Sequence, residues 1–461
     1  MRGLISAVLL AAVLGIGGGG VAAAETGRAG YSVEEARALG MEAIRLRRPD
    51  KAAEIALALL DRDPADAFAH MLMARALLDG GQPKAAGNAA RTAFSHAATP
   101  VQRQQSARLV AMAAYAEGRL GLSQRWLRRA TAAAPEATRA QTARELAAVR
   151  RQNPMSVTLR FSAMPSNNVN NGASSEFNII DGVPIVGWLS PDGMALSGVV
   201  AEGHGGFRFR LSQGDGGFST FLGARVDARR VELSREARAA APDLDPRRYD
   251  SARAEVTWSG LLQPKGKPWE WSLDVGAGAQ TEGGAFSYRF LRAGTGLTRG
   301  FDDRTAGNVS IGFERRDAGT GARPVIASNL ALGLRRILPD EHVLSLTGFI
   351  GKLDTPVAGR SSTTLGAEIG WEAARPVGPA LLALRASYAK TEFPGYWVGP
   401  IEVPGGRRDR TVSAAADLTF PGLAVQGFAP RLTISHSDTS SNVSRFDTRR
   451  VGMQFGLSAR F

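Results

Sequence analysis

The sequence predicts a multidomain α plus β protein, in which an N-terminal helical repeat solenoid precedes a 14-stranded antiparallel transmembrane β-barrel. Three observations predict this fold. The chain is alanine-rich with helical periodicity up to about residue 151, it changes to a period of two from Ser156 onward, and its last strand has one apolar and one polar face. After the first two dozen residues no apolar run reaches eighteen residues, so any later membrane crossing must use strands.

Residues 1–24 are predicted to be a secretory signal peptide. Arg2 precedes an apolar core from Leu4 to Ile16, and small residues lead up to Ala24. We expect cleavage after Ala24. A retained membrane anchor is the alternative, but the apolar core is short and broken by glycines. The mature chain is therefore expected outside the cytoplasm.

Residues 25–151 are predicted to form a tetratricopeptide-like helical domain. The spacings of one such repeat are matched by Leu39, Gly40, Ala43, Ala52, Ala56 and Pro64. Small residues stand where two helices would touch, and proline stands where the second helix must stop. Looser copies follow at 65–98 and 101–135, and 136–151 resembles a capping helix. An unrelated alanine-rich bundle is the alternative.

The helical segment carries most of the excess positive charge. It has 20 basic and 13 acidic residues in a chain of formal charge +13, so it is the more basic part per residue. Such solenoids bind peptides or proteins in a concave groove. The candidate contacts are Arg119, Arg125, Arg128 and Arg129. A solvated face is the alternative. Without aromatic interleaving or a recognition motif, we expect no nucleic-acid partner, and acidic lipid headgroups or acidic client segments fit better.

Residues 152–461 are predicted to form the barrel. The even number of strands is what a closed single-chain barrel requires. We place fourteen strands near 156–163, 194–211, 217–231, 249–262, 268–280, 286–298, 305–317, 325–336, 341–353, 361–374, 379–392, 410–420, 428–437 and 448–461. Tryptophans near strand ends suit the aromatic band at a membrane interface, namely Trp258, Trp269, Trp371 and Trp397.

The last strand is typical of the closing strand of an outer-membrane barrel, and the chain ends on the aromatic Phe461. One face is apolar, with Val451, Met453, Phe455, Leu457, Ala459 and Phe461. The other face is polar and suits a wet lumen. An edge strand of a soluble sandwich shows the same alternation, so this strand alone leaves both folds open.

The lengths of the connections favour the membrane barrel. If the helical domain lies in the periplasm, odd-numbered connections lie outside the cell and even-numbered ones inside. Outer-membrane barrels keep periplasmic turns short and have longer outer loops. The three longest predicted connections, 164–193, 232–248 and 393–409, are all odd-numbered. A soluble sandwich does not need this ordering.

Two short segments resemble the surface lipoprotein assembly modifier family. They are PSNNVNNGAS (Pro165 to Ser174), just after the first barrel strand, and DTSSNVSRFDTRRVGMQF (Asp438 to Phe455), at the final hairpin. The family combines a tetratricopeptide domain with an outer-membrane barrel and moves surface lipoproteins, and in some cases soluble proteins, to the cell surface. The resemblance implies a client lipoprotein or secreted protein as partner. Outer-membrane lipid, periplasmic chaperones and the barrel assembly machinery are further expected partners.

The asparagine-rich segments are expected at the outer ends of the first and last strands, which must be neighbours for the barrel to close. The residues expected above this seam are Asn167, Asn168, Asn170, Asn171, Ser441 and Asn442. They are candidates for client contact or for gating the seam. The preference of asparagine for tight turns is the alternative explanation.

Enzyme chemistry is not indicated, and we expect no catalytic, cofactor or metal site. The chain has no cysteine, and His70, His96, His204, His342 and His436 lack metal-ligand spacing. No phosphate-binding loop is present. The function expected is an outer-membrane translocator with its helical domain in the periplasm. The alternatives are an exopolysaccharide-export porin with a tetratricopeptide domain and a simple outer-membrane diffusion channel.

Overall fold

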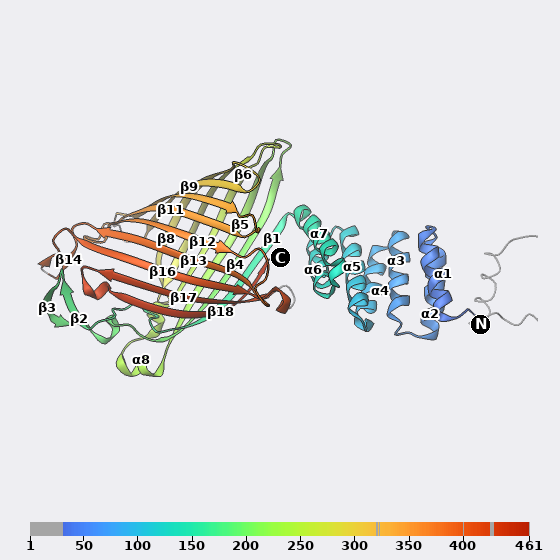
Figure 1. Cartoon of the computed structure of the whole chain (residues 1–461), viewed down its shortest axis with the longest axis horizontal. Helices are drawn as coiled ribbons and strands as arrows, with labels where there is room; N and C mark the ends of the chain where they lie inside the picture. The colour runs from blue at the N-terminus through green and yellow to red at the C-terminus, as the bar shows by residue number, and fades with distance from the viewer. Residues whose placement is uncertain (1–30, 320, 322, 400, 425–427, 461) are drawn as a thin grey trace, which may run out of the picture. The chain divides into compact units, whose positions relative to one another are not determined.

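The computed structural model describes residues 31–460, apart from 320, 322, 400 and 425–427 (Figure 1). The signal-peptide segment and Phe461 lie outside the described residues. The chain divides between Asn153 and Pro154 into two compact units, a helical one and a β-barrel. In the part of the chain that is described, no helix has both the length and the apolar character needed to cross a membrane.

The described helical unit consists of three helical hairpins and a last helix. Its helices are α1 (Val33–Arg45), α2 (Pro49–Arg62), α3 (Ala67–Asp79), α4 (Pro83–His96), α5 (Pro100–Ala116), α6 (Leu120–Ala133) and α7 (Glu136–Gln152). Proline begins α2, α4 and α5, where its missing N–H costs no hydrogen bond. The three hairpins turn through left-handed residues, Arg47 (φ 54°), Gly81 (φ 73°) and Gly118 (φ 73°). This recurrence supports the predicted repeat.

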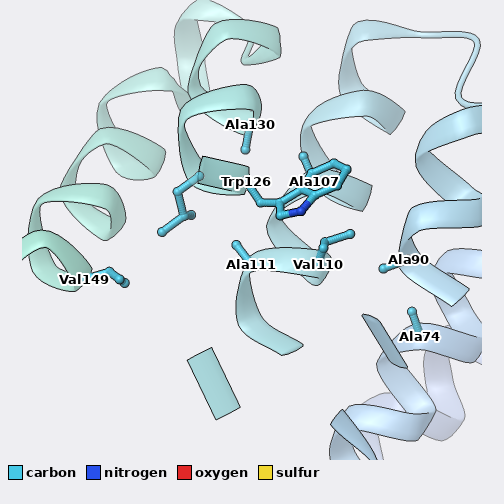
Figure 2. Close-up of a cluster of buried hydrophobic side chains, with 9 residues drawn as sticks. Ala74, Ala90, Ala107, Val110, Ala111, Trp126, Ala130 and Val149 are labelled. Carbon is cyan, nitrogen blue, oxygen red and sulfur yellow. The ribbon is translucent and has the colours of Figure 1, made fainter. Parts of the chain in front are cut away.

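Small residues let the helices approach closely. Ala52, Ala56, Ala90 and Ala107 have no exposed surface, and Figure 2 shows Ala90 and Ala107 in a cluster with Trp126 from α6. A Cβ at Gly40 would lie 2.4 Å from Leu72 Cδ2, so a larger residue here would require the buried Leu72 side chain to move. Of the residues matched to the repeat, Leu39 and Pro64 are exposed rather than packed between helices.

The second unit is a closed barrel of fourteen antiparallel strands, which confirms the predicted number. The strands are β1 (Met155–Ser166), β4 (Gly198–Gln213), β5 (Phe218–Leu233), β6 (Ser251–Leu262), β7 (Trp269–Glu282), β8 (Ala285–Gly300), β9 (Thr305–Asp317), β10 (Val325–Ile337), β11 (Val343–Asp354), β12 (Ser362–Glu372), β13 (Leu381–Phe393), β16 (Arg407–Thr419), β17 (Ala429–Ser441) and β18 (Thr448–Arg460). β1 pairs with β18 and closes the barrel, for example Phe161 opposite Leu457.

The closing pair is shorter than its neighbours. Seven described residue pairs define the register of β1 against β18, whereas the other barrel pairs have ten or more. Pro165 lies in this stretch of β1 and has no N–H to donate to the ladder. The seam is therefore the least extensively paired line in the described wall.

The two faces of the wall differ as the alternation predicted. On β18, Val451, Met453, Phe455 and Leu457 are 42–53% exposed, which suits contact with lipid. A polar row runs across the other face from strand to strand. Its members are Arg160, His204, Asp227, Arg253 and Gln280, each opposite the next.

The three longest connections share one end of the barrel, and they contain structure that the sequence analysis treated as plain loop. They span 167–197, 234–250 and 394–406. Figure 1 shows β2, β3 and β14 at the end away from the start of β1. The extra elements are β2 (Phe177–Ile180), β3 (Val183–Trp188), α8 (Arg235–Ala240), β14 (Trp397–Val398), β15 (Ile401–Glu402) and the short 3₁₀ turns η2 (Pro191–Gly193) and η3 (Pro246–Tyr249). A further 3₁₀ turn, η5 (Ser444–Phe446), lies in the short connection between β17 and β18.

The ordering by length is not uniform. The shortest connection, Gly283–Gly284, also lies at the long-loop end. It can be this short because both glycines adopt positive φ (59° and 81°) in a two-residue hairpin. Trp258, Trp269 and Trp371 lie near the opposite end, where an interfacial band is expected. Trp397 lies in β14, so the expectation that it belongs to the band at a barrel strand's end was wrong.

Candidate functional site

The polar faces of the strands enclose a cavity of about 830 Å³ inside the barrel. One side is formed by β1 and β4 to β7, and the other by β13 and β16 to β18. Six arginines line the cavity: Arg160, Arg225, Arg229, Arg253, Arg385 and Arg431. Three carboxylates line it as well: Glu202, Asp227 and Asp417. The lining therefore carries more positive than negative charge.

Asp417 forms the most buried ion-pair cluster of this cavity. Its side chain accepts hydrogen bonds from Arg385 Nη2 at 2.8 Å and from Arg431 Nε at 3.1 Å, and it lies 2.6 Å from Arg431 Nη2 in an ion pair. Thr433 Oγ1 donates to the same carboxylate. Asp417 is 5% exposed, whereas both arginine side chains are 40% exposed or more. Two guanidinium groups thus share one carboxylate and remain open to the lumen.

On the facing wall the positive charges are less fully neutralised. Asp227 lies 2.7 Å from both Arg225 Nε and His204 Nδ1. Arg229 donates to the carbonyl oxygen of Val169 at 2.9 Å. Among the described side chains, Arg160 has no ion-pair or hydrogen-bond partner. This wall supplies guanidinium groups that can reach a ligand without breaking an ion pair.

The adjoining wall over β6 to β9 is held by a denser ion-pair network. Arg292 contacts Glu255 and Asp274, and Glu255 is only 6% exposed. Arg253 and Arg316 both lie 2.6 Å from Glu314. Two of these contacts join strands that are not neighbours, namely Arg292 with Glu255 (β8 to β6) and Arg253 with Glu314 (β6 to β9), so they hold the wall in shape.

Besides Arg385, Asp417 and Arg431, the lumen face of β12 to β17 carries pairs of neutral hydroxyl groups. Hydroxyl groups meet across adjacent strands at Thr364 and Thr391 (2.9 Å), Thr411 and Thr439 (2.9 Å), and Ser413 and Ser437 (3.0 Å). A hydroxyl group can donate and accept hydrogen bonds but carries no charge, so it does not hold a charged ligand by an ion pair. The lumen therefore combines charged and neutral polar walls.

At the long-loop end, the connection from β1 crosses the seam and binds the β17–β18 connection. We call residues 174–189 the strap. Ile179 N donates to Ser444 Oγ at 2.7 Å, and Asp181 N donates to the carbonyl oxygen of Asn442 at 2.8 Å. Ile180 pairs with Val443 as an isolated bridge and packs with Val403. The strap thus ties the first strand's loop to the last hairpin.

The predicted asparagine set is divided among several local roles. Asn167 Oδ1 accepts from Val451 N across the seam at 2.9 Å. Asn168 and Asn170 bind backbone groups of their own connection, and Asn171 adopts positive φ (55°) in a turn. Asn442 reaches Asp181 in the strap at 3.2 Å.

Ser441 completes the set. Its N–H donates to Asp447 Oδ1 at 2.6 Å, and its Oγ accepts from Val443 N. Asn167 and Asn442 thus bridge to the other side of the seam or to the strap, while the other members shape turns.

Acidic and aromatic groups lie beneath the strap. Arg407 stacks on Phe393 and Phe446, each 3.6 Å from the ring centre, and pairs with Asp409 at 3.1 Å. Burial, together with the like charges of Asp409 and Asp438, raises the pKa of Asp447 above its usual value.

The four predicted arginines of the helical unit also have different surroundings. Arg119 pairs with Glu117 at 3.1 Å, and Arg129 stacks on Trp126 at 4.6 Å. Burial and the like charges of Arg150 and Arg125 lower the pKa of Arg128 to about 10. Arg150 could not be predicted as part of this group, because its approach to Arg128 joins helices α6 and α7.

Sequence reasoning also missed the lumen cavity. The pairing of Asp417 with Arg385 and Arg431 depends on strand register, which alternation along a single strand does not give. Within the described residues, no group of three or more metal-binding side chains lies close enough to hold an ion.

No protein-family model matches the chain, and no curated protein matches it. Among solved structures, it is similar to the type III secretion translocator chaperone SycD of Yersinia enterocolitica (14% identity, covering 26% of this chain and 84% of that one, TM-score 0.24). It is also similar to a bacterial polysaccharide outer membrane secretin (9% identity, covering 66% of this chain and 98% of that one, TM-score 0.34). A third similar structure is OpdQ of Pseudomonas aeruginosa (10% identity, covering 67% of this chain and 98% of that one, TM-score 0.34).

Proposed function

We propose that this protein is a non-enzymatic outer-membrane translocator that delivers a lipoprotein or secreted protein from the periplasm to the cell surface. The observation that carries the proposal is the direct joining of a helical repeat unit to a closed barrel. Only Asn153 and Pro154 separate α7 from β1. A client held by the repeat unit would be tethered to the end of the barrel at which β1 begins.

The size of the barrel indicates that the client passes unfolded. Fourteen strands about 4.8 Å apart and tilted about 40° enclose a cylinder roughly 28 Å across between backbones. A folded domain of about 100 residues has a radius of gyration near 13 Å, so it is too wide once side chains fill part of the lumen. Refolding outside the cell would then favour outward movement.

The proposed partners follow from this role. They are a client lipoprotein or secreted protein, outer-membrane lipid, periplasmic chaperones and the barrel assembly machinery. The two asparagine-containing segments resemble the surface lipoprotein assembly modifier family, and a helical repeat unit with a barrel agrees with that resemblance. No nucleic acid is involved.

Surface display of a lipoprotein in a deletion strain tests the proposal. We expect the client on the surface of cells that make the full chain, and in the periplasm of cells that make residues 152–461 behind the native signal peptide. Equal barrel levels in the outer-membrane fraction are the control. Display without the protein, or with the barrel alone, would contradict the proposal. Conductance and glycan export in the same strains test the channel and exporter alternatives.

A further inference from the structure

The lumen cavity is lined by more guanidinium groups than carboxylates, so the ion pairs of its wall do not neutralise all of the positive charge. Arg385 and Arg431 share Asp417, and Arg229 binds only a carbonyl oxygen among its described contacts. The planar guanidinium group of arginine can donate two parallel hydrogen bonds to one carboxylate, so it recognises this anion more specifically than a point charge such as the ammonium group of lysine does. The cavity thus offers several carboxylate sites on facing walls.

Asp417 shows what such a ligand would look like when bound. Its carboxylate lies between two guanidinium groups and also accepts from Thr433. A carboxylate of a passing chain can take the same donors, because both arginine side chains remain at least 40% exposed. Arg160, on the facing wall, is available to a second carboxylate.

We propose that the cavity lined by Arg160, Arg229, Arg385 and Arg431 binds the carboxylates of an acidic polypeptide segment. This inference rests on the proposed function and names a chemical property of the client. The neutral hydroxyls of β12 to β17 leave the rest of the segment weakly held, so binding in the cavity need not stop movement. A free small organic acid also carries a carboxylate, but it lacks a series of carboxylates linked in one chain and therefore cannot occupy several of these arginines at once.

Binding of a fluorescent oligo-glutamate peptide to the full mature protein in detergent, at low salt, tests this. Arg160→Gln and Arg229→Gln should each weaken binding about fivefold, since one charge at about 4 Å in water is worth roughly that factor. Asp417→Asn should strengthen binding by a similar factor, because it leaves both Arg385 and Arg431 for the ligand. A variant that merely damaged the fold would weaken binding instead.

The controls separate the lumen from other basic surfaces. Arg449→Gln, whose side chain is 70% exposed beside Asp438, should leave the affinity unchanged. Arg125→Gln removes a candidate contact of the helical unit and shows whether the peptide binds there instead of in the lumen. Oligo-lysine should not compete, and free glutamate at equal carboxylate concentration should compete only weakly. Heat-dependent gel mobility checks that each barrel is folded.

Three outcomes would overturn the inference: no binding, binding that only Arg125→Gln weakens, or equal competition by free glutamate. Failure here is distinguishable from failure of the proposed function. Surface display without oligo-glutamate binding would remove the inference alone, whereas binding in the lumen without display of any lipoprotein would remove the proposed function.

Discussion

Asp447 lies where three carboxylates come close beneath the strap. It keeps its hydrogen bond from Ser441 N although Asp409 and Asp438 repel its charge. Because its pKa is raised in the folded state, its contribution favours folding at pH values below about 3.8 and is lost as the pH rises through the raised value. The long-loop end of the barrel therefore carries a small electrostatic strain at neutral pH.

The variant Asp447→Asn should remove that strain. Its amide oxygen can still accept from Ser441 N, while the charge is gone. We expect its melting temperature to exceed that of the native protein by more at pH 7 than at pH 3.5. Thermal unfolding at both pH values measures this. A constant difference between the two pH values would contradict the account.

Trp126 tests the packing of the helical repeats. Its side chain is 8% exposed and meets Phe94 edge to face at 5.2 Å. Trp126→Ala should destabilise the helical unit by about 3–5 kcal/mol, because it leaves a cavity between α4, α5 and α6. Helical circular dichroism of the full chain during urea unfolding measures this loss. Met112→Ala, at a 42% exposed site on α5, is the matched control and should change stability little.

Among the structural elements, the strap was readable from the sequence but was missed. Asp181 and Gly182 form an Asp-Gly turn between apolar residues, with φ values of 46° and 82°, and this dipeptide is a strong hairpin signal. The long strands were found because alternation persists over ten or more residues. The contacts of the strap with Asn442 and Ser444, in contrast, join residues more than 260 positions apart.

A disulfide tests the position of the strap in a chain that has no native cysteine. Ile180 and Val443 are opposed as a bridge pair, so Ile180→Cys with Val443→Cys should oxidise spontaneously and stabilise the protein by up to about 5 kcal/mol in the chain-entropy model. Gel mobility with and without reductant reports the bond. Ile180→Cys with Val357→Cys, in the β11–β12 connection, should not cross-link. Failure of the first pair to oxidise would place the strap elsewhere.

For the whole molecule, sequence patterns predicted the number of strands, the apolar face of β18 and the three helical hairpins. Each of these features rests on a pattern that repeats along the chain, so many residues support the same prediction. The cavity around Asp417 could not be predicted, because it depends on which strands face each other across the barrel. Lumen charges follow from register and closure, which local periodicity does not encode.

The central claim is that the barrel spans the outer membrane with its long loops outside and the helical unit in the periplasm. The most direct measurement is labelling of single-cysteine variants on intact cells with a membrane-impermeant maleimide. Ala240→Cys in α8 should react on intact cells, whereas Asp215→Cys in the β4–β5 turn and Arg91→Cys in α4 should react only after the outer membrane is opened. Labelling of Asp215→Cys or Arg91→Cys on intact cells, with Ala240→Cys protected, would contradict the account.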